Sequence, residues 1–185
     1  RPFEQIRNSI GYPHLNVKIA ATHAGLSVGE DGASHQCCED IALMRSIPGM
    51  VILSPSDDVE ARGAVIAAYN YNGPVYLRFS RLATPVYHDP ATYQFQIGKG
   101  ERLTEGYDIA VIATGLMVPE ALRAAVLAKR QGISIRVINM PTIKPIDEEI
   151  ILTAARECRR IITVEEHSII GGLGEAVCSV VSEKM

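Results

Sequence analysis

Short apolar runs of strand length alternate with stretches of helical periodicity along most of this chain. Such runs cover residues 50–53, 75–79, 109–113 and 133–138, and segments with apolar residues every three or four positions separate most of them. Two parallel strands must be joined by a crossover of about a dozen residues, which is usually a helix. The alternation therefore predicts an α/β fold, with two three-layer α/β/α units built on mainly parallel sheets.

Caps and turn residues set the limits of the predicted elements. Pro2 suits the first turn of a helix, and Asp57 followed by Glu60 forms a capping-box pattern. Helices are expected over residues 2–10, 38–46, 57–71, 119–131, 147–158 and 171–183, and strands over residues 17–21, 50–53, 75–79, 109–113, 133–138 and 160–164. The first of these strands is predicted to be buried, and residues 140–142 are predicted to form a turn.

The regular patterns lapse between residues 80 and 96, where prolines stand at positions 85 and 90. Such a segment is typical of a linker. We therefore place a boundary near residues 88–92, which divides the chain into residues 1–88 and 89–185. Because the chain opens on Arg1 rather than Met, we expect it to be a fragment and its second unit to be incomplete.

The charge balance argues against a nucleic-acid partner. The 18 Lys and Arg residues face 21 Asp and Glu residues, which gives a net charge of −3 and no general positive field for a polyanion. Aromatic residues make up 5% of the chain and Trp is absent, so no stacking platform for single strands is expected. No apolar run approaches the roughly 18 residues of a membrane span, so no membrane role is expected.

The four cysteines predict a reducing compartment and no metal site. Cys37, Cys38, Cys158 and Cys178 form neither a C-x-x-C pair nor the framework of a small secreted domain, so we expect reduced thiols and a cytoplasmic protein. Cys37 and Cys38 lie close to His35, but adjacent cysteines lack the two-residue gap that lets both thiolates bind one zinc ion. We interpret both as small buried side chains.

One polar, glycine-rich segment, residues 22–36, holds the side chains best suited to chemistry, and we call it the 22–36 loop. It follows a predicted parallel strand, and ligands of open α/β sheets bind at the carboxyl ends of such strands. Its two histidines and two carboxylates, His23, His35, Glu30 and Asp31, can supply acid, base and hydrogen-bonding groups to a small polyhydroxylated ligand. On spacing alone, a solvated connection is an open alternative and a metal site is a weaker one.

The two glycine clusters of the chain do not match phosphate-binding motifs. Residues 29–32 (GEDG) lack the Gly-Lys-Ser/Thr ending of a P-loop, and residues 171–174 (GGLG) differ from G-x-G-x-x-G. The second cluster opens a predicted helix, whose free amides can attract an anion. We favour the alternative, a tight packing turn between a strand and a helix.

Several motifs resemble, in order and spacing, those of the C-terminal half of transketolase. They are Thr22-His23-Ala24-Gly25, residues 29–36 (GEDGASHQ), Arg45-Ser46-Ile47-Pro48, Ser54-Pro55-Ser56-Asp57 and Arg78-Phe79-Ser80-Arg81, and later Gly115, Pro145, Val164-Glu165-Glu166-His167 and Gly171-Gly172. The resemblance implies a partial pyrimidine-binding domain over residues 1–88 and a C-terminal domain over residues 89–185. Deoxyxylulose-phosphate synthase and the β chains of 2-oxoacid dehydrogenases share this domain pair.

The resemblance implies an enzyme that uses thiamin diphosphate and Mg²⁺ to move a two-carbon ketol unit between sugar phosphates, as in the pentose phosphate pathway. In this family a separate domain of a partner holds the diphosphate and Mg²⁺, which implies a homo- or hetero-oligomer such as a dimer. By motif position, His23 and Arg81 resemble the residues that grip the substrate phosphate. Asp31 resembles the carboxylate that binds a substrate hydroxyl. His35 resembles the histidine near the donor carbonyl, so His35 and His23 are the candidate catalytic residues.

Two family features are missing, which predicts that this chain alone is inactive. The glutamate that activates the cofactor would precede residue 1, and the Gly-Asp-Gly and Asn-Asn motif for diphosphate and Mg²⁺ is absent. The cofactor-binding residues therefore stay unassigned, upstream of Arg1 or on a partner chain, and neither thiamin diphosphate nor Mg²⁺ is expected to bind this chain alone.

Two alternatives to a transketolase stay open. A deoxyxylulose-phosphate synthase fragment would decarboxylate pyruvate, but synthase-like sequences tend to have Arg where this chain has Thr22-His23. Arg1 is either placed like a phosphate-binding arginine of the synthase or a solvated chain end. The other alternative is a non-catalytic half-subunit that serves as an assembly module. For Arg78 and residues 165–167 we favour structural or interface roles over contacts with a ligand.

Overall fold

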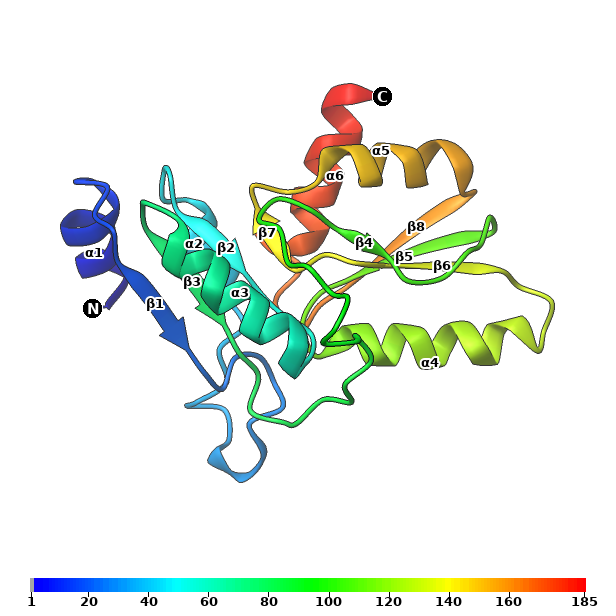
Figure 1. The fold of residues 1–185 in the computed structure, drawn as a ribbon, viewed down its shortest axis with the longest axis horizontal. Coiled ribbons are helices and arrows are strands. Elements are labelled where there is room, and N and C mark those ends of the chain that lie inside the picture. The colour runs from blue at the N-terminus through cyan, green and yellow to red at the C-terminus, as the bar shows by residue number, and fades with distance from the viewer. Residues whose placement is uncertain (1) are drawn as a thin grey trace.

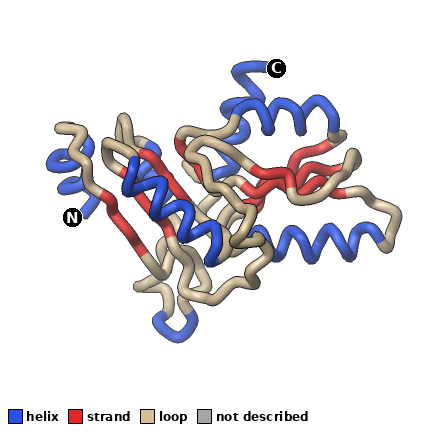
Figure 2. Tube along the Cα trace, viewed as in Figure 1, coloured by secondary structure: helices blue, strands red, loops and turns tan. Residues whose placement is uncertain are grey.

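Two four-stranded sheets, each with helices on both faces, make up the computed structural model, which describes residues 2–185 (Figure 1). Figure 2 shows the two sheets as separate groups of strands with helices packed around them. The predicted fold class, two three-layer α/β/α units with mainly parallel sheets, is confirmed. The expectation for Arg1 falls outside the described residues. Among the described helices, none combines the length and the apolar character that crossing a membrane requires.

The first sheet is built from three parallel strands and one antiparallel strand. Its members are β1 (Lys18–Ala21), β2 (Val51–Leu53), β3 (Val75–Arg78) and β7 (Thr142–Lys144), in the order β1-β3-β2-β7. Tyr76 of β3 lies opposite Ile19 of β1 and Ile52 of β2, whereas β7 pairs antiparallel with β2. Because the first three strands run the same way, the segments that follow them leave from one edge of the sheet.

Helices cover both faces of the first sheet. They are α1 (Pro2–Gln5), the π-helical turn η1 (Ile6–Gly11) and α2 (Asp40–Arg45) on one face, and α3 (Asp58–Asn70) on the other. The α2 side chains Ile41 and Met44 pack against Ile52 in one core cluster. On the other face, α3 presents Ala64 and Ala68, whose small side chains let the helix lie close to the strands.

The second sheet has the order β4-β6-β5-β8, in which β5 pairs in parallel with both β6 and β8 and β4 is antiparallel. Its elements are β4 (Glu101–Arg102), β5 (Ile109–Ala113), α4 (Met117–Lys129), β6 (Ile135–Asn139), α5 (Glu148–Glu157), β8 (Arg160–Val164) and α6 (Leu173–Lys184). Helix α4 covers one face, and α5 and α6 cover the other, where Ile112 and Ile138 are fully buried.

Three strands differ from the predictions. The prediction of a buried β1 is wrong: its residues are half-buried or exposed, because β1 is an edge strand that, among the described strands, pairs with β3 alone. Strands β4 and β7 are not predicted, since two or three residues are too few to show a period of two. Strand β7 begins at Thr142, the last residue of the predicted turn, and carries Ile143 into the core of the first unit, so it joins the two units.

The predicted linker is anchored by a buried histidine. His88 is only 7% exposed, and its Nδ1 and Nε2 lie 2.9 Å from Oδ2 of Asp57 and 2.8 Å from Oε2 of Glu101. Burial lowers the pKa of His88, but the hydrogen bonds to Glu101 and Asp57 outweigh it and raise the pKa to about 9. The imidazolium thus bridges a carboxylate at the start of α3 and one on β4 of the second sheet.

Glu60 extends this cluster and carries the most buried carboxylate in it. It accepts hydrogen bonds from the backbone N–H of Ser56 at 2.7 Å, the Tyr93 hydroxyl at 2.6 Å and the Asn139 side-chain amide at 2.7 Å. Burial raises the pKa of Glu60 in spite of these bonds. Asp57 caps α3 by accepting from the Glu60 N–H at 2.8 Å, as predicted, but the Glu60 carboxylate returns to Ser56 instead of to Asp57.

Candidate functional site

The 22–36 loop leaves the first sheet after β1, beside the end of β3. A bridge closes its stem, in which the N–H groups of Gly25 and Cys37 donate to each other's carbonyl groups at 2.8 and 3.2 Å. The N–H of Ala24 donates to the carbonyl of Phe79 at 3.2 Å, which ties the loop to the segment that follows β3. The loop therefore lies at the carboxyl edge of the parallel strands, the usual place for a ligand site in an α/β sheet.

Asp31 and Arg81 meet at the tip of this loop. Gly29–Asp31 form a 3₁₀ turn, and the Arg81 guanidinium lies 3.8 Å from Oδ2 of Asp31 and 3.9 Å from Oε1 of Glu30. Gly29 has a φ of +68°, and a Cβ there would lie 3.2 Å from Nη1 of Arg81, so a larger residue would be strained and would crowd the guanidinium. Both ion pairs are long and solvated, and such pairs contribute less than about 1 kcal/mol. The guanidinium can therefore exchange them for an anionic ligand.

Among the described residues, each of the two loop histidines forms a side-chain hydrogen bond with the residue that precedes it. Nδ1 of His23 lies 3.0 Å from the Thr22 hydroxyl, and Nδ1 of His35 lies 2.9 Å from the Ser34 hydroxyl. Both rings are exposed, and His23 has a φ of +64°. The structure thus brings together two of the four predicted site residues, Asp31 and Arg81. None of the four lines any of the five cavities described in residues 2–185. The convergence of all four on one ligand stays a prediction.

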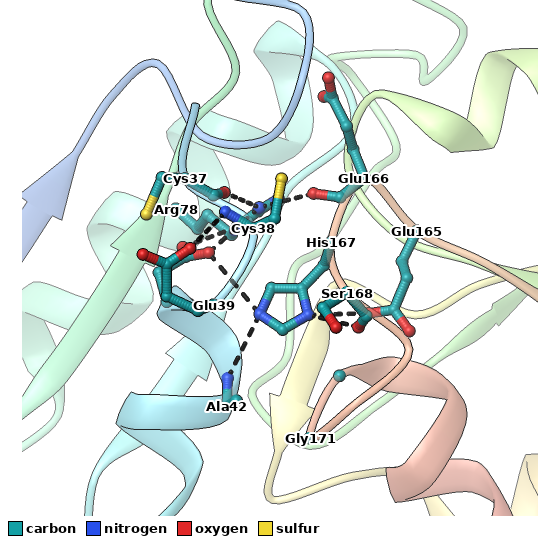
Figure 3. A network of polar contacts seen from close by, with 12 residues as sticks. Cys37, Cys38, Glu39, Ala42, Arg78, Glu165, Glu166, His167, Ser168 and Gly171 are labelled. Carbon is teal, nitrogen blue, oxygen red and sulfur yellow. Dashed lines mark hydrogen bonds and ion pairs between the residues drawn. The ribbon is translucent and has the colours of Figure 1, made fainter. Parts of the chain in front are cut away.

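Arg78, the last residue of β3, connects this strand with α2 and with the segment that follows β8. Its Nε and Nη2 donate to the two carboxylate oxygens of Asp40 at 2.8 and 3.2 Å, and both side chains are buried. The Tyr76 hydroxyl donates to the same carboxylate at 2.9 Å. Nη2 of Arg78 also donates to the carbonyl of Glu166 at 2.8 Å, on the segment after β8 (Figure 3). The structural role that the sequence favours for Arg78 is confirmed.

Glu165, directly after β8, caps a helix of its own unit. The Glu165 carboxylate accepts the N–H groups of Leu173 at 2.6 Å and Gly174 at 2.9 Å, so it caps the start of α6. The anion site predicted as an alternative at residues 171–174 is therefore wrong, because a carboxylate of the chain itself takes these amides. A Cβ at Gly172 would lie 2.2 Å from Oε2 of Glu165, which explains the glycine.

His167 caps a helix of the first unit. Its Nε2 accepts the N–H of Ala42, in the first turn of α2, at 3.4 Å, and its Nδ1 lies 2.7 Å from the carbonyl of Ser168 (Figure 3). A neutral ring with its proton on Nδ1 satisfies both contacts. The Ser168 N–H in turn donates to the carbonyl of Cys38 at 2.8 Å. The structural role that the sequence favours for residues 165–167 is confirmed by these contacts within the chain.

The thiols and carboxylates near the loop do not form a metal-binding group. Cys37 and Cys38 are free and half-buried, and burial, with nearby carboxylates, raises the pKa of both thiols. Within the described residues, no group of three or more His, Cys, Asp and Glu side chains is arranged to hold a metal ion.

Two models of known protein families match this chain, and together they cover all of it except residues 87–97. The family model "Transketolase, pyrimidine binding domain" matches residues 1–86, and "Transketolase, C-terminal domain" matches residues 98–185. A putative transketolase C-terminal section from Methanocaldococcus jannaschii is 52% identical over 183 residues, which cover 98% of this chain and 57% of that protein. One of the subunits of an apulose-4-phosphate transketolase from Phocaeicola vulgatus is 41% identical over 99% of this chain and 59% of its own length. A solved structure described as a split gene transketolase, inactive β4 tetramer, has a TM-score of 0.92 and 48% identity, with 98% of this chain and 58% of that chain covered.

The two sheets with helices on both faces define an α/β protein, and its candidate site is the polar loop at the carboxyl edge of the first sheet. This chain belongs to the transketolase family of thiamin-diphosphate-dependent proteins and corresponds to the C-terminal half. It spans less than three fifths of the length of the curated relatives reported above.

Proposed function

We propose that this chain is the C-terminal section of a transketolase, which transfers a two-carbon ketol unit between sugar phosphates. The observation that carries the proposal is the match with a putative transketolase C-terminal section, 52% identical over 98% of this chain. The exposed pair of Asp31 and Arg81 at the carboxyl edge of the first sheet supports it, because a carboxylate and a guanidinium are the groups that bind a hydroxyl and a phosphate.

The proposed roles follow from the chemistry of the four predicted site residues. Arg81 and His23 bind the substrate phosphate, for which a planar guanidinium offers a fork of N–H donors. Asp31 accepts a hydrogen bond from a substrate hydroxyl. His35, which is exposed on the same loop, donates a hydrogen bond to the donor carbonyl or moves a proton there. Substrate binding must then replace the loose ion pairs between Arg81 and the loop carboxylates.

We propose that this chain does not hold thiamin diphosphate and Mg²⁺ by itself, because its sequence lacks the Gly-Asp-Gly and Asn-Asn motif that binds the diphosphate and Mg²⁺ in this family. We therefore derive no step through the cofactor on this chain. We propose that the residues that bind it, including the activating glutamate, belong to a preceding segment or to an N-terminal, diphosphate-binding partner. In the enzymes of this family thiamin diphosphate supplies the carbanion chemistry.

Further proposals concern the assembly. The complete enzyme is a homo- or hetero-oligomer in the cytoplasm, works in the pentose phosphate pathway, and is inactive without the diphosphate-binding half. The split relatives named above support a separate partner subunit. We also propose that a domain boundary lies near residues 88–92, in the segment between β3 and β4.

The direct test is reconstitution with an N-terminal transketolase section. The complex should transfer a two-carbon unit from a ketose phosphate to an aldose phosphate when supplied with thiamin diphosphate and Mg²⁺. This chain alone should show no transfer, and calorimetry should detect no binding of the cofactor to it. Release of CO₂ from pyruvate instead would identify a synthase. A well-formed complex without either activity would favour the assembly module.

A substitution at Asp31 tests the substrate role separately from cofactor binding. Because the proposed contact is with the sugar, Asp31→Ala in the reconstituted complex should lower turnover by about tenfold or more and leave the affinity for thiamin diphosphate unchanged. Glu30→Ala is the matched control, since this neighbouring carboxylate also pairs loosely with Arg81 but is not proposed to contact the substrate. Equal activity of Asp31→Ala and its parent would remove the assignment.

A further inference from the structure

Glu166 belongs to the second unit, yet its side chain reaches the 22–36 loop of the first. Its backbone is fixed, because its carbonyl accepts a hydrogen bond from Nη2 of Arg78 at 2.8 Å and the Ser168 N–H donates to Cys38 at 2.8 Å. In Figure 3 the Glu166 side chain points away from the His167 ring. Glu166 therefore extends from a rigid point on the second unit.

The loop backbone is wrapped around the Glu166 carboxylate. Oε1 accepts the N–H of Leu26 at 2.7 Å and also the N–H of Ser27. Gly25 has a φ of +86°, and a Cβ there would lie 2.3 Å from Cδ of Glu166, so the carboxylate occupies the space of a missing side chain. Two hydrogen bonds and one steric fit thus fix three consecutive residues of the loop.

This fixed stretch leads directly to the candidate substrate residues. Val28, which follows Ser27, is fully buried, and the 3₁₀ turn that ends at Asp31 begins at the next residue. Arg81 lies over that turn. The position of Asp31 therefore depends on the Glu166 contact, four residues earlier, whereas Arg81 meets Asp31 only through a loose ion pair.

We propose that Glu166 is a positioning residue, which holds the 22–36 loop in the conformation that presents Asp31 and Arg81 to the substrate. The assignment of substrate binding to that loop rests on the proposed function. Glu166 does not touch the substrate. Through it the second unit, which contains none of the predicted site residues, sets the geometry of the site in the first.

Kinetics of the reconstituted complex supply the first test. Glu166→Ala leaves two loop amides without their acceptor, so we expect the KM for the sugar phosphate to rise by about tenfold and kcat to fall much less. Glu166→Gln keeps Oε1 as an acceptor and should stay within about twofold of the parent. The matched control is Glu165→Ala, which also removes a carboxylate with two amide partners, but at the start of α6; its KM should equal that of the parent.

Hydrogen exchange on the same complex supplies a readout that does not depend on activity. Glu166→Ala should speed exchange at the amides of Leu26 and Ser27, Glu166→Gln should leave them protected, and Glu165→Ala should speed exchange only at Leu173 and Gly174. Parent-like exchange at Leu26 and Ser27, or a parent-like KM, in Glu166→Ala overturns the proposal. If the parent complex lacks ketol transfer, the proposed function fails, and the exchange result alone decides whether Glu166 anchors the loop.

Discussion

The protonated state of His88 gives this protein a stability that falls as the pH rises. The ring is clamped between Asp57 on one side and Glu101 on the other, Glu60 lies nearby, and the Tyr87 and Tyr93 rings flank it at centroid distances of 4.3 and 4.0 Å. An imidazolium in this position satisfies two carboxylates at once. The neutral ring can donate to only one of them and leaves the other without its partner.

The size of the effect follows from the raised pKa. Raising the pKa of His88 from 6.5 to about 9 corresponds to about 3 kcal/mol, at about 1.4 kcal/mol per pKa unit. Because the folded pKa is the higher one, this stabilisation is complete below about pH 6.5, the pKa of an unfolded histidine, and is lost as the pH rises through about 9.

Urea unfolding at several pH values measures this loss. Between about pH 6.5 and pH 9.5, the free energy of unfolding of the parent should fall by about 3 kcal/mol more than that of His88→Asn, whose amide can replace the contact to Asp57 but does not titrate. Parallel curves for the parent and His88→Asn would refute the reasoning.

Two further predictions concern the ion pair of Asp40 and Arg78 and the cap that Glu165 forms on α6. Arg78→Ala leaves the Asp40 carboxylate buried without its two-pronged partner, so urea unfolding should show a loss of about 3–5 kcal/mol, and a loss below about 1 kcal/mol would contradict this. Gly172→Ala pushes the Glu165 carboxylate off the start of α6 and should cost about 1–2 kcal/mol, as should Glu165→Ala. Since both changes break the same cap, the double variant should lose no more than the larger single loss, and additive losses would disprove the shared cause.

The parts of the fold that can be predicted are those with enough residues to show a period. Helix α4 and strands β5 and β6 lie within two residues of the predicted limits at nearly every end, because their apolar patterns are long and their ends carry Gly115 and Gly132. Strands β4 and β7 are too short for a pattern, and their pairing depends on residues 35 or more positions away. The predicted burial of β1 is wrong for a related reason. Its local pattern does not reveal that β1 is the edge strand of the sheet, with a described neighbour, β3, on one side.

The place of the candidate site in the fold could be predicted from the sequence, but the contacts that hold its loop could not. A polar, glycine-rich segment after a parallel strand is enough to place the 22–36 loop at the carboxyl edge of the sheet. Nothing local reveals that Leu26 and Ser27 donate to Glu166, which lies 140 and 139 residues further along the chain. The buried role of His88 is hidden in the same way, because its partners come from α3 and β4 while its own neighbours have the composition of a linker.

The charged groups between the two units serve geometry more than stability. Burying an ion pair such as Asp40 and Arg78 gains little net free energy over an apolar pair of similar size, because desolvation offsets most of the attraction. An apolar contact, however, tolerates small rotations, whereas a two-pronged ion pair and the two amide bonds accepted by Glu166 each fix a direction. We propose that the loop needs such directional contacts because it must present Asp31 to the substrate within a fraction of an ångström. The hydrogen bonds that Glu166, His167 and Arg78 make between the two units supply them.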